Sequence, residues 1–207
     1  EIREIFAECF PTFLATFLFS LIETVPKFAM EGALPYDDQL FFNAIYFPAQ
    51  AIAMALGLVY KPQLVRLANI WADPNHRRRF DLVVIAISGV GVGICAIVFV
   101  FNMLFGVPIL TVLYGADFAP YKTNLLMMVV AGGMTAVVDF LYQTITVLRR
   151  QEVATRIYLL TFGIATVLAL VLVNTIGFVG AVWTYLLSMA TLFVLLIAQY
   201  VVLRVKG

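Results

Sequence analysis

The sequence predicts an all-α polytopic membrane protein, and three observations support that fold class. Of its 207 residues, 63% are hydrophobic and only 12% are charged, whereas a soluble domain carries roughly 25% charged residues. The mean hydropathy is +1.02. The apolar residues also occur in runs long enough to cross a bilayer, which takes about 20 helical residues. Lipid offers no hydrogen bonds to the backbone, so runs of this length are expected to be helices.

We expect six transmembrane helices packed in one bundle. Their predicted spans cover roughly residues 5–29, 39–60, 82–105, 122–147, 156–174 and 178–202. No internal repeat and no Gly-rich or Ser-rich linker divides the chain. Residues 1–207 are therefore interpreted as a single transmembrane helical bundle.

The longest polar segment follows the second predicted span. Lys61-Pro62 is expected to end that helix, and residues 61–81 are expected to form an aqueous loop. Within this loop, residues 64–71 carry apolar side chains at helical spacing. This pattern indicates a short amphipathic helix that could lie on the membrane surface.

Lysine and arginine fall mostly on one side of the predicted spans. Only Lys27 and Lys122 lie on the other side. Cytoplasmic loops of membrane proteins are enriched in Lys and Arg, so both termini and the two basic loops are expected in the cytoplasm. The eleven basic residues on that side are Arg3, Lys61, Arg66, Arg77, Arg78, Arg79, Arg149, Arg150, Arg156, Arg204 and Lys206.

Charged residues near the end of the first predicted span are candidates for function. Glu23, Lys27 and Glu31 are spaced four apart, which places them on one helical face. A charge deep in a bilayer costs roughly 2.5–3.5 kcal/mol on insertion scales, so this face should turn toward a wet cavity or a partner. The alternative is that Glu23 and Lys27 neutralise each other as a structural pair.

The second and fourth predicted spans carry further polar residues at one-face spacing. These are Asn43, Tyr46 and Gln50 in the second span, and Asp139 and Gln143 in the fourth. Asp139 is the sharpest signal because a carboxylate this deep must be protonated, paired or part of a cation or proton site. The alternative is a hydrogen bond between helices.

Several glycines lie inside predicted spans. Residues 89–93 carry alternating glycines, but they lack the preceding strand of a nucleotide-binding motif. Gly89 and Gly93 are instead expected to permit close helix packing, and Gly132-Gly133 is expected to do the same.

The sequence offers no cofactor or metal site and no enzyme signature. Cys9 and Cys95 lie far apart in apolar runs and are expected to pack rather than to react. His76, the only histidine, lies in a basic loop without ligand partners. No P-loop, His-Glu-x-x-His or Gly-x-Ser-x-Gly motif occurs, so an enzyme is disfavoured. The arginine run 77–79 is expected to anchor topology, with binding of anionic lipid headgroups as an alternative, and nucleic acid is not an expected partner.

Two segments carry a resemblance to a known family. Residues 23–31 (ETVPKFAME), followed by the Asp37-Asp38 turn and Lys61-Pro62, resemble polysaccharide flippases of the multidrug/oligosaccharidyl-lipid/polysaccharide exporter superfamily. Residues 113–118 (LYGADF) are similar to that family's Leu-Tyr-Gly turn. The chain departs from the family pattern at Thr24, where Asn is usual, and at Phe28, where Tyr is usual.

The resemblance implies the C-terminal six-helix half of a transporter with twelve or more helices. The missing N-terminal half would be its partner, together with membrane lipids, and the start of the chain at Glu1 agrees with a fragment. The implied activity is movement of lipid-linked oligosaccharide across the bacterial cytoplasmic membrane by alternating access, in polysaccharide or lipopolysaccharide biosynthesis.

The same resemblance implies roles for the candidate residues. Lys27 would contact phosphate and Asp139 would couple an ion. The residues expected to hydrogen-bond sugar or water are Glu23, Asn43, Gln50 and Gln143. Two alternatives remain open, which are a multidrug cation antiporter of the same superfamily and a membrane scaffold that transports nothing.

Overall fold

The computed structural model describes residues 2–72 and 77–206, with side chains described for 10–72 and 77–204. Within these residues the chain is helical without strands, and six helices are long and apolar enough to cross a membrane. This confirms the all-α polytopic fold class and indicates a multi-pass membrane protein. The predictions for His76 and for the side chains of Cys9, Arg3 and Lys206 fall outside the described residues.

Every predicted span coincides with a helix. The helices are α1 (Ile2–Ala33), α2 (Tyr36–Tyr60), α3 (Leu64–Ala72), α4 (Arg77–Phe101), α5 (Val107–Tyr114), α6 (Lys122–Val147), α7 (Gln151–Ile176) and α8 (Phe178–Lys206). A π-helical segment, Asn102–Gly106, joins α4 to α5, and 3₁₀ turns occupy Lys61–Gln63 and Ala119–Tyr121. Helix α6 has the predicted bounds, and most of the others extend beyond the predicted spans because helix geometry continues past the apolar residues that mark a span.

The second helix ends at Lys61-Pro62 as predicted, because the last residue of α2 is Tyr60. One 3₁₀ turn, Lys61–Gln63, connects α2 directly to α3. Pro62 sits in the first positions of that turn, where its missing N–H costs no hydrogen bond. The predicted aqueous loop 61–81 is therefore largely helical. The predicted helix over 64–71 is confirmed as α3, which packs against α4 and α6.

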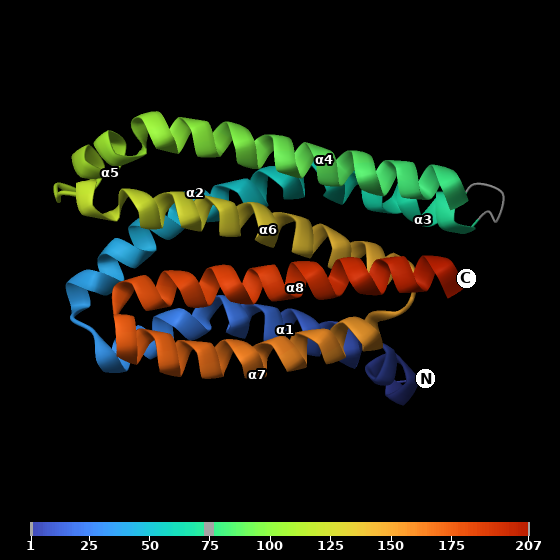
Figure 1. Ribbon diagram of the computed structural model, residues 1–207. Helices are drawn as coiled ribbons and strands as arrows, with labels where there is room; N and C mark the ends of the chain where they lie inside the picture. The colour runs from blue at the N-terminus through green and yellow to red at the C-terminus, as the bar shows by residue number, and fades with distance from the viewer. Residues whose placement is uncertain (1, 73–76, 207) are drawn as a thin grey trace.

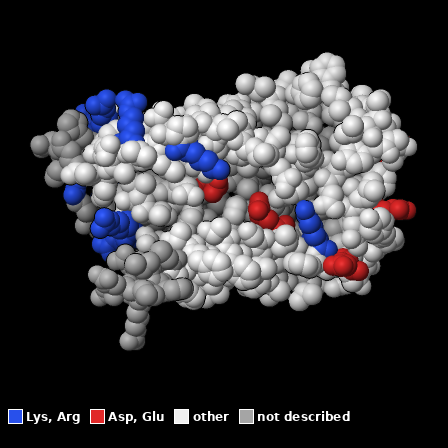
Figure 2. Space-filling model, turned by 180° about the vertical axis from the view of Figure 1, so that it is seen from behind, with Lys and Arg blue, Asp and Glu red and all other residues white. Residues whose placement is uncertain are grey.

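The long helices run side by side with both termini at the same end of the bundle (Figure 1). The end of α3, the start of α4 and the α6–α7 connection lie at that end too. The α1–α2, α5–α6 and α7–α8 connections lie at the opposite end. This arrangement agrees with an even number of spans. It places the two predicted basic segments beside the termini, and Figure 2 shows basic side chains gathered mainly at one end.

Helix α6 forms the centre of the bundle. Its membrane span is 72% buried, compared with 17% to 44% for the other five spans. It packs against α2, α4 and α8, while α1 packs mainly on α7. Residues on α6 therefore contact protein on most sides, whereas the other helices keep broad apolar faces that suit lipid.

Close approach of α6 to its neighbours depends on a glycine pair. A Cβ at Gly132 would collide with the backbone of Ala49 on α2, and a Cβ at Gly133 would collide with Cys95 on α4. The Cys95 thiol donates to the carbonyl of Val129, 3.6 Å away. The predicted close packing at Gly132-Gly133 and the packing role of Cys95 are confirmed.

The same prediction was wrong for the glycines of α4. A Cβ at Gly89 or Gly93 would meet nothing within 4 Å. The residue between them makes the contact instead, because a Cβ at Gly91 would lie 2.9 Å from Leu56 and 3.3 Å from Val137. Gly89 and Gly93 are exposed because they lie on the outer face of the helix.

The predicted turn between the third and fourth spans is present after α5. Gly115 has a φ of 68°, the left-handed conformation that favours glycine at a helix end, and its N–H donates to the carbonyl of Thr111 at 2.9 Å. Asp117 then accepts a hydrogen bond of 2.9 Å from the N–H of Ala119. These two bonds turn the chain from α5 toward α6.

At the end that holds the termini, a charged pair joins α4 to α8. Asp81 accepts hydrogen bonds from Arg204 at 2.7 Å and 2.5 Å, and another of 2.6 Å from the hydroxyl of Tyr200. Both charged side chains are partly buried. Residues 123 positions apart in sequence thus fix α4 and α8 together at one end of the bundle.

Candidate functional site

A polar cavity of about 280 Å³ lies between α1, α2, α6 and α8. It is lined by Phe19, Glu23, Tyr46, Ala49, Gln50, Ala53, Met54, Thr135, Asp139 and Tyr185. Figure 2 shows the face that carries α1 and α2 hollowed near its middle, with acidic side chains there. Polar groups from four helices therefore meet inside the membrane-spanning part of the bundle.

Glu23 and Lys27 of α1 meet on one tyrosine of α2. The hydroxyl of Tyr46 donates to Glu23 Oε1 at 3.1 Å. The Lys27 Nζ lies 4.4 Å from the centre of the same ring, which is the geometry of a cation–π contact. Glu31, one helical turn further along α1, is exposed. Tyr46 thus holds an acidic and a basic side chain next to each other at the edge of the cavity.

Asp139 of α6 is hydrogen-bonded to α2. The hydroxyl of Tyr60 donates to Asp139 Oδ2, so the bond between helices that the sequence left open as an alternative is present. Asp139 also lines the cavity, as Glu23 does. Two carboxylates from different helices therefore share one cavity in the interior of the spans.

A buried pair of hydroxyls on α6 and α8 completes the cavity wall. The oxygens of Thr135 and Tyr185 lie 2.8 Å apart in a hydrogen bond. The Tyr185 ring meets the Tyr46 ring edge to face, with 5.2 Å between their centres. The sequence analysis missed Thr135, Tyr185 and Tyr60, because a single hydroxyl in an apolar helix forms no spacing pattern.

The cavity contains only some of the predicted site residues. Glu23, Gln50 and Asp139 line it, while Lys27 reaches its edge through Tyr46. Asn43 lies exposed on α2, and Gln143 lies half-buried on α6 one turn after Asp139. Neither is among the lining residues, so their roles in substrate contact stay predictions.

The cavity offers hydrogen-bond acceptors and aromatic faces to a ligand. Two carboxylates and an amide accept hydrogen bonds from hydroxyl or ammonium groups, and the tyrosine rings offer flat apolar faces. In the part of the chain that the structure describes, no group of three or more His, Cys, Asp or Glu gathers as metal ligands do.

Comparisons with protein families, with curated proteins and with solved structures gave no match to this chain.

Proposed function

We propose that this chain is a transporter, a flippase that moves lipid-linked oligosaccharide across the bacterial cytoplasmic membrane by alternating access. The observation that carries the proposal is the open cavity lined by two carboxylates within helices of membrane-spanning length. Carboxylates inside a membrane are costly, and they are retained mainly where they contact a substrate or an ion. The resemblance of residues 23–31 and 113–118 to polysaccharide flippases supplies the substrate class.

The lining suits a sugar headgroup. Sugar hydroxyls would donate to Glu23, Asp139 and Gln50, and the rings of Tyr46 and Tyr185 would pack against the apolar faces of the sugar. At about 280 Å³ the cavity is slightly smaller than the roughly 300–1,000 Å³ of typical ligand pockets. A second surface would have to complete it, which is the place of the expected N-terminal half.

Lys27 is the cation we assign to the phosphates of the substrate. Its ammonium lies against the Tyr46 ring at the edge of the cavity and is half-buried. Phosphate would attract it more strongly than an aromatic face does, because an ammonium–phosphate contact is a charge-assisted hydrogen bond. The polyprenyl tail would remain in the lipid beside the exposed apolar faces.

Export of a cationic drug is the second candidate. The cavity holds two carboxylates but only one lysine at its edge, and three aromatic rings, Phe19, Tyr46 and Tyr185, line its wall. Acidic and aromatic groups together favour organic cations. In that case Glu23 and Asp139 would bind the drug or exchange it for protons, and Lys27 would be dispensable.

The test is transport of a fluorescent lipid-linked oligosaccharide into proteoliposomes by the full-length gene product. The Lys27→Ala variant lacks a charge-assisted contact with the phosphate, so its transport should be slower by about tenfold or more. Lys122→Ala is the matched control, because Lys122 is an exposed lysine at the start of α6, away from the cavity.

The outcomes separate the candidates. Equal rates in the two lysine variants would remove the phosphate role of Lys27. If the wild-type protein exports a cationic dye but does not transport the oligosaccharide, the second candidate is favoured. Transport of neither probe would favour a scaffold.

A further inference from the structure

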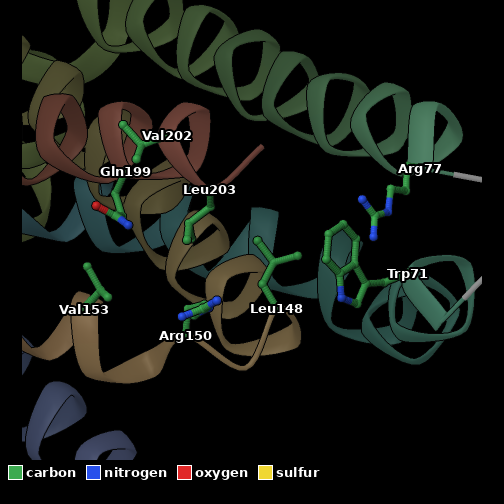
Figure 3. A pocket seen from close by; sticks show the side chains of 8 residues that line it. All are labelled: Trp71, Arg77, Leu148, Arg150, Val153, Gln199, Val202 and Leu203. Carbon is green, nitrogen blue, oxygen red and sulfur yellow. The ribbon is translucent and has the colours of Figure 1, made fainter. Parts of the chain in front are cut away.

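A second cavity lies at the end of the bundle that holds the termini. Its volume is about 380 Å³, and it shares no lining residue with the polar cavity described above. It is lined by Trp71, Arg77, Leu148, Arg150, Val153, Gln199, Val202 and Leu203. Figure 3 shows Trp71 and Arg77 on one side, Val153 and Gln199 on the other, and Leu148, Arg150 and Leu203 between them. The end of α3, the start of α4, the α6–α7 turn with the start of α7, and the end of α8 therefore enclose it.

The surroundings of this cavity carry an excess of positive charge. Residues 77–81 and 148–156 contain six arginines and two acids, Asp81 and Glu152. Asp81 is already bonded to Arg204 at the end of α8. An anion entering here would meet a net positive field, with Arg77 and Arg150 in the lining itself.

A tight turn brings Arg150 to the cavity. Arg149 has a φ of 55°, a left-handed conformation that residues other than glycine seldom adopt. The N–H of Arg150 then donates to the carbonyl of Ile145 at 3.3 Å, which folds the turn back on the end of α6. This is a common way for a helix to end, and here it places Arg150 at the cavity.

Trp71 indicates the depth of the cavity in the membrane. The guanidinium carbons of Arg77 and Arg204 lie 5.4 Å and 5.5 Å from the centre of its indole ring. Tryptophan and arginine together are typical of the level of the lipid headgroups. The apolar side chains of Leu148, Val202 and Leu203 line the same cavity. The site thus places a cationic part beside an apolar part, which complements the anionic headgroup and the apolar chains of an anionic phospholipid.

We propose that this cavity binds an anionic phospholipid by its phosphate group. Arg150 contacts the phosphate oxygens, because the planar guanidinium matches phosphate with two parallel hydrogen bonds. The amide of Gln199 donates to an ester oxygen, and the first carbons of the acyl chains lie along Val202 and Leu203. This lipid is separate from the transported substrate, so the site is independent of the proposed flippase activity.

The cavity contains its own reporter. The chain has two tryptophans, so Trp183→Phe leaves Trp71 as the only one. The protein in neutral detergent is titrated with dioctanoyl phosphatidylglycerol, dioctanoyl phosphatidylcholine or inorganic phosphate, and the emission of Trp71 is followed. We expect the emission change to saturate with phosphatidylglycerol, and we expect the affinity for the other two probes to be lower. Equal affinity for inorganic phosphate would overturn the assignment to a lipid.

Two exposed arginines of the same region provide a matched comparison. In the Trp183→Phe background, Arg150→Gln should weaken phosphatidylglycerol binding by about tenfold, the loss of one charge-assisted hydrogen bond. Arg156→Gln removes the same charge from α7 outside the cavity lining and should leave affinity nearly unchanged. Equal weakening in the two variants would mean diffuse attraction to the basic end and would overturn the site.

A conservative variant guards against a folding defect. Arg150→Lys keeps the charge but loses the two-pronged geometry, so its affinity should fall between those of the wild type and Arg150→Gln. Wild-type affinity in both Arg150 variants would overturn the role of Arg150. Lipid-linked oligosaccharide transport by the same variants is a separate measurement, so failure of this proposal and failure of the flippase proposal are distinguishable.

Discussion

The hydroxyl of Tyr60 donates a hydrogen bond to Asp139 across 79 residues of sequence, tying α2 to α6. This bond gives the carboxylate a protein partner inside the span while the same side chain lines the polar cavity. Asp139 is therefore both a structural acceptor and a group that a substrate or proton can reach.

Removing the Tyr60 hydroxyl should destabilise the α2–α6 contact. Hydrogen bonds between transmembrane helices average about 0.6 kcal/mol and reach about 1.7 kcal/mol, so Tyr60→Phe should lower the free energy of unfolding by about 1 kcal/mol. Unfolding in mixed detergent micelles measures this change. Tyr36→Phe is the control because Tyr36 is exposed at the start of α2. Equal stability of the two variants would contradict the bond.

Two substitutions of Tyr46 should separate its contacts with Glu23 and Lys27. Tyr46→Phe removes the donor to Glu23 but keeps a ring under the Lys27 ammonium, whereas Tyr46→Leu removes both. Loss of one hydrogen bond to a charged group should slow oligosaccharide transport by about tenfold in Tyr46→Phe, and Tyr46→Leu should be slower still. Identical rates in the two variants would show that the ring contact with Lys27 does not matter.

Packing at Gly132 should tolerate no side chain. Gly132→Ala places a methyl group against the backbone of Ala49, so α2 and α6 must separate. Overpacking typically costs about 1–3 kcal/mol. Gly93→Ala is the matched control, since a methyl group there meets nothing within 4 Å, and thermal stability in detergent should be unchanged or higher. A stable Gly132→Ala protein would mean that the helices adjust without cost.

The Asp81–Arg204 pair should show energetic coupling. We expect a double-mutant cycle of Asp81→Asn and Arg204→Gln to give about 1 kcal/mol, because both side chains are only partly buried and solvent screens the pair. The measurement is the free energy of unfolding of the four proteins in detergent. Strictly additive single effects would show that the pair adds nothing to the α4–α8 contact.

The orientation of the bundle can be tested with single cysteines. In a protein whose Cys9 and Cys95 are replaced by alanine, Arg78→Cys should react with a membrane-impermeant thiol reagent only from the cytoplasmic side. Thr123→Cys, at the opposite end in α6, should react only from outside. Both positions are exposed. The reverse labelling pattern would invert the predicted topology.

The sequence was sufficient to predict the helices, because few other structures satisfy the backbone hydrogen bonds of an apolar run of bilayer length. It also located Glu23 and Asp139, since a carboxylate in an apolar run is visible without any partner. Their partners Tyr46 and Tyr60 could not be assigned, because each contact joins residues 23 or 79 positions apart. Such pairs depend on how whole helices rotate against one another.

The errors have the same physical origin. Spacing alone selected Gly89 and Gly93 for close packing, but the rotation of α4 turns Gly91 toward Leu56 instead. Residues 61–81 were expected to form a loop, yet Pro62 lies in the first positions of a new turn where proline is tolerated, and α3 follows that turn directly. Local chemistry restricts the backbone structures that each residue can adopt, and tertiary packing decides which of those structures occurs.

The contact between Gly132 and the backbone of Ala49 determines which parts of the molecule can move. With no space between them, α2 and α6 have no room to slide, and Tyr60 locks the same pair further along. Helix α1 packs mainly on α7 and touches α2 much less. Moving α1 away from α2 would therefore break the Tyr46–Glu23 hydrogen bond at the edge of the polar cavity, while the contact between α2 and α6 keeps its spacing.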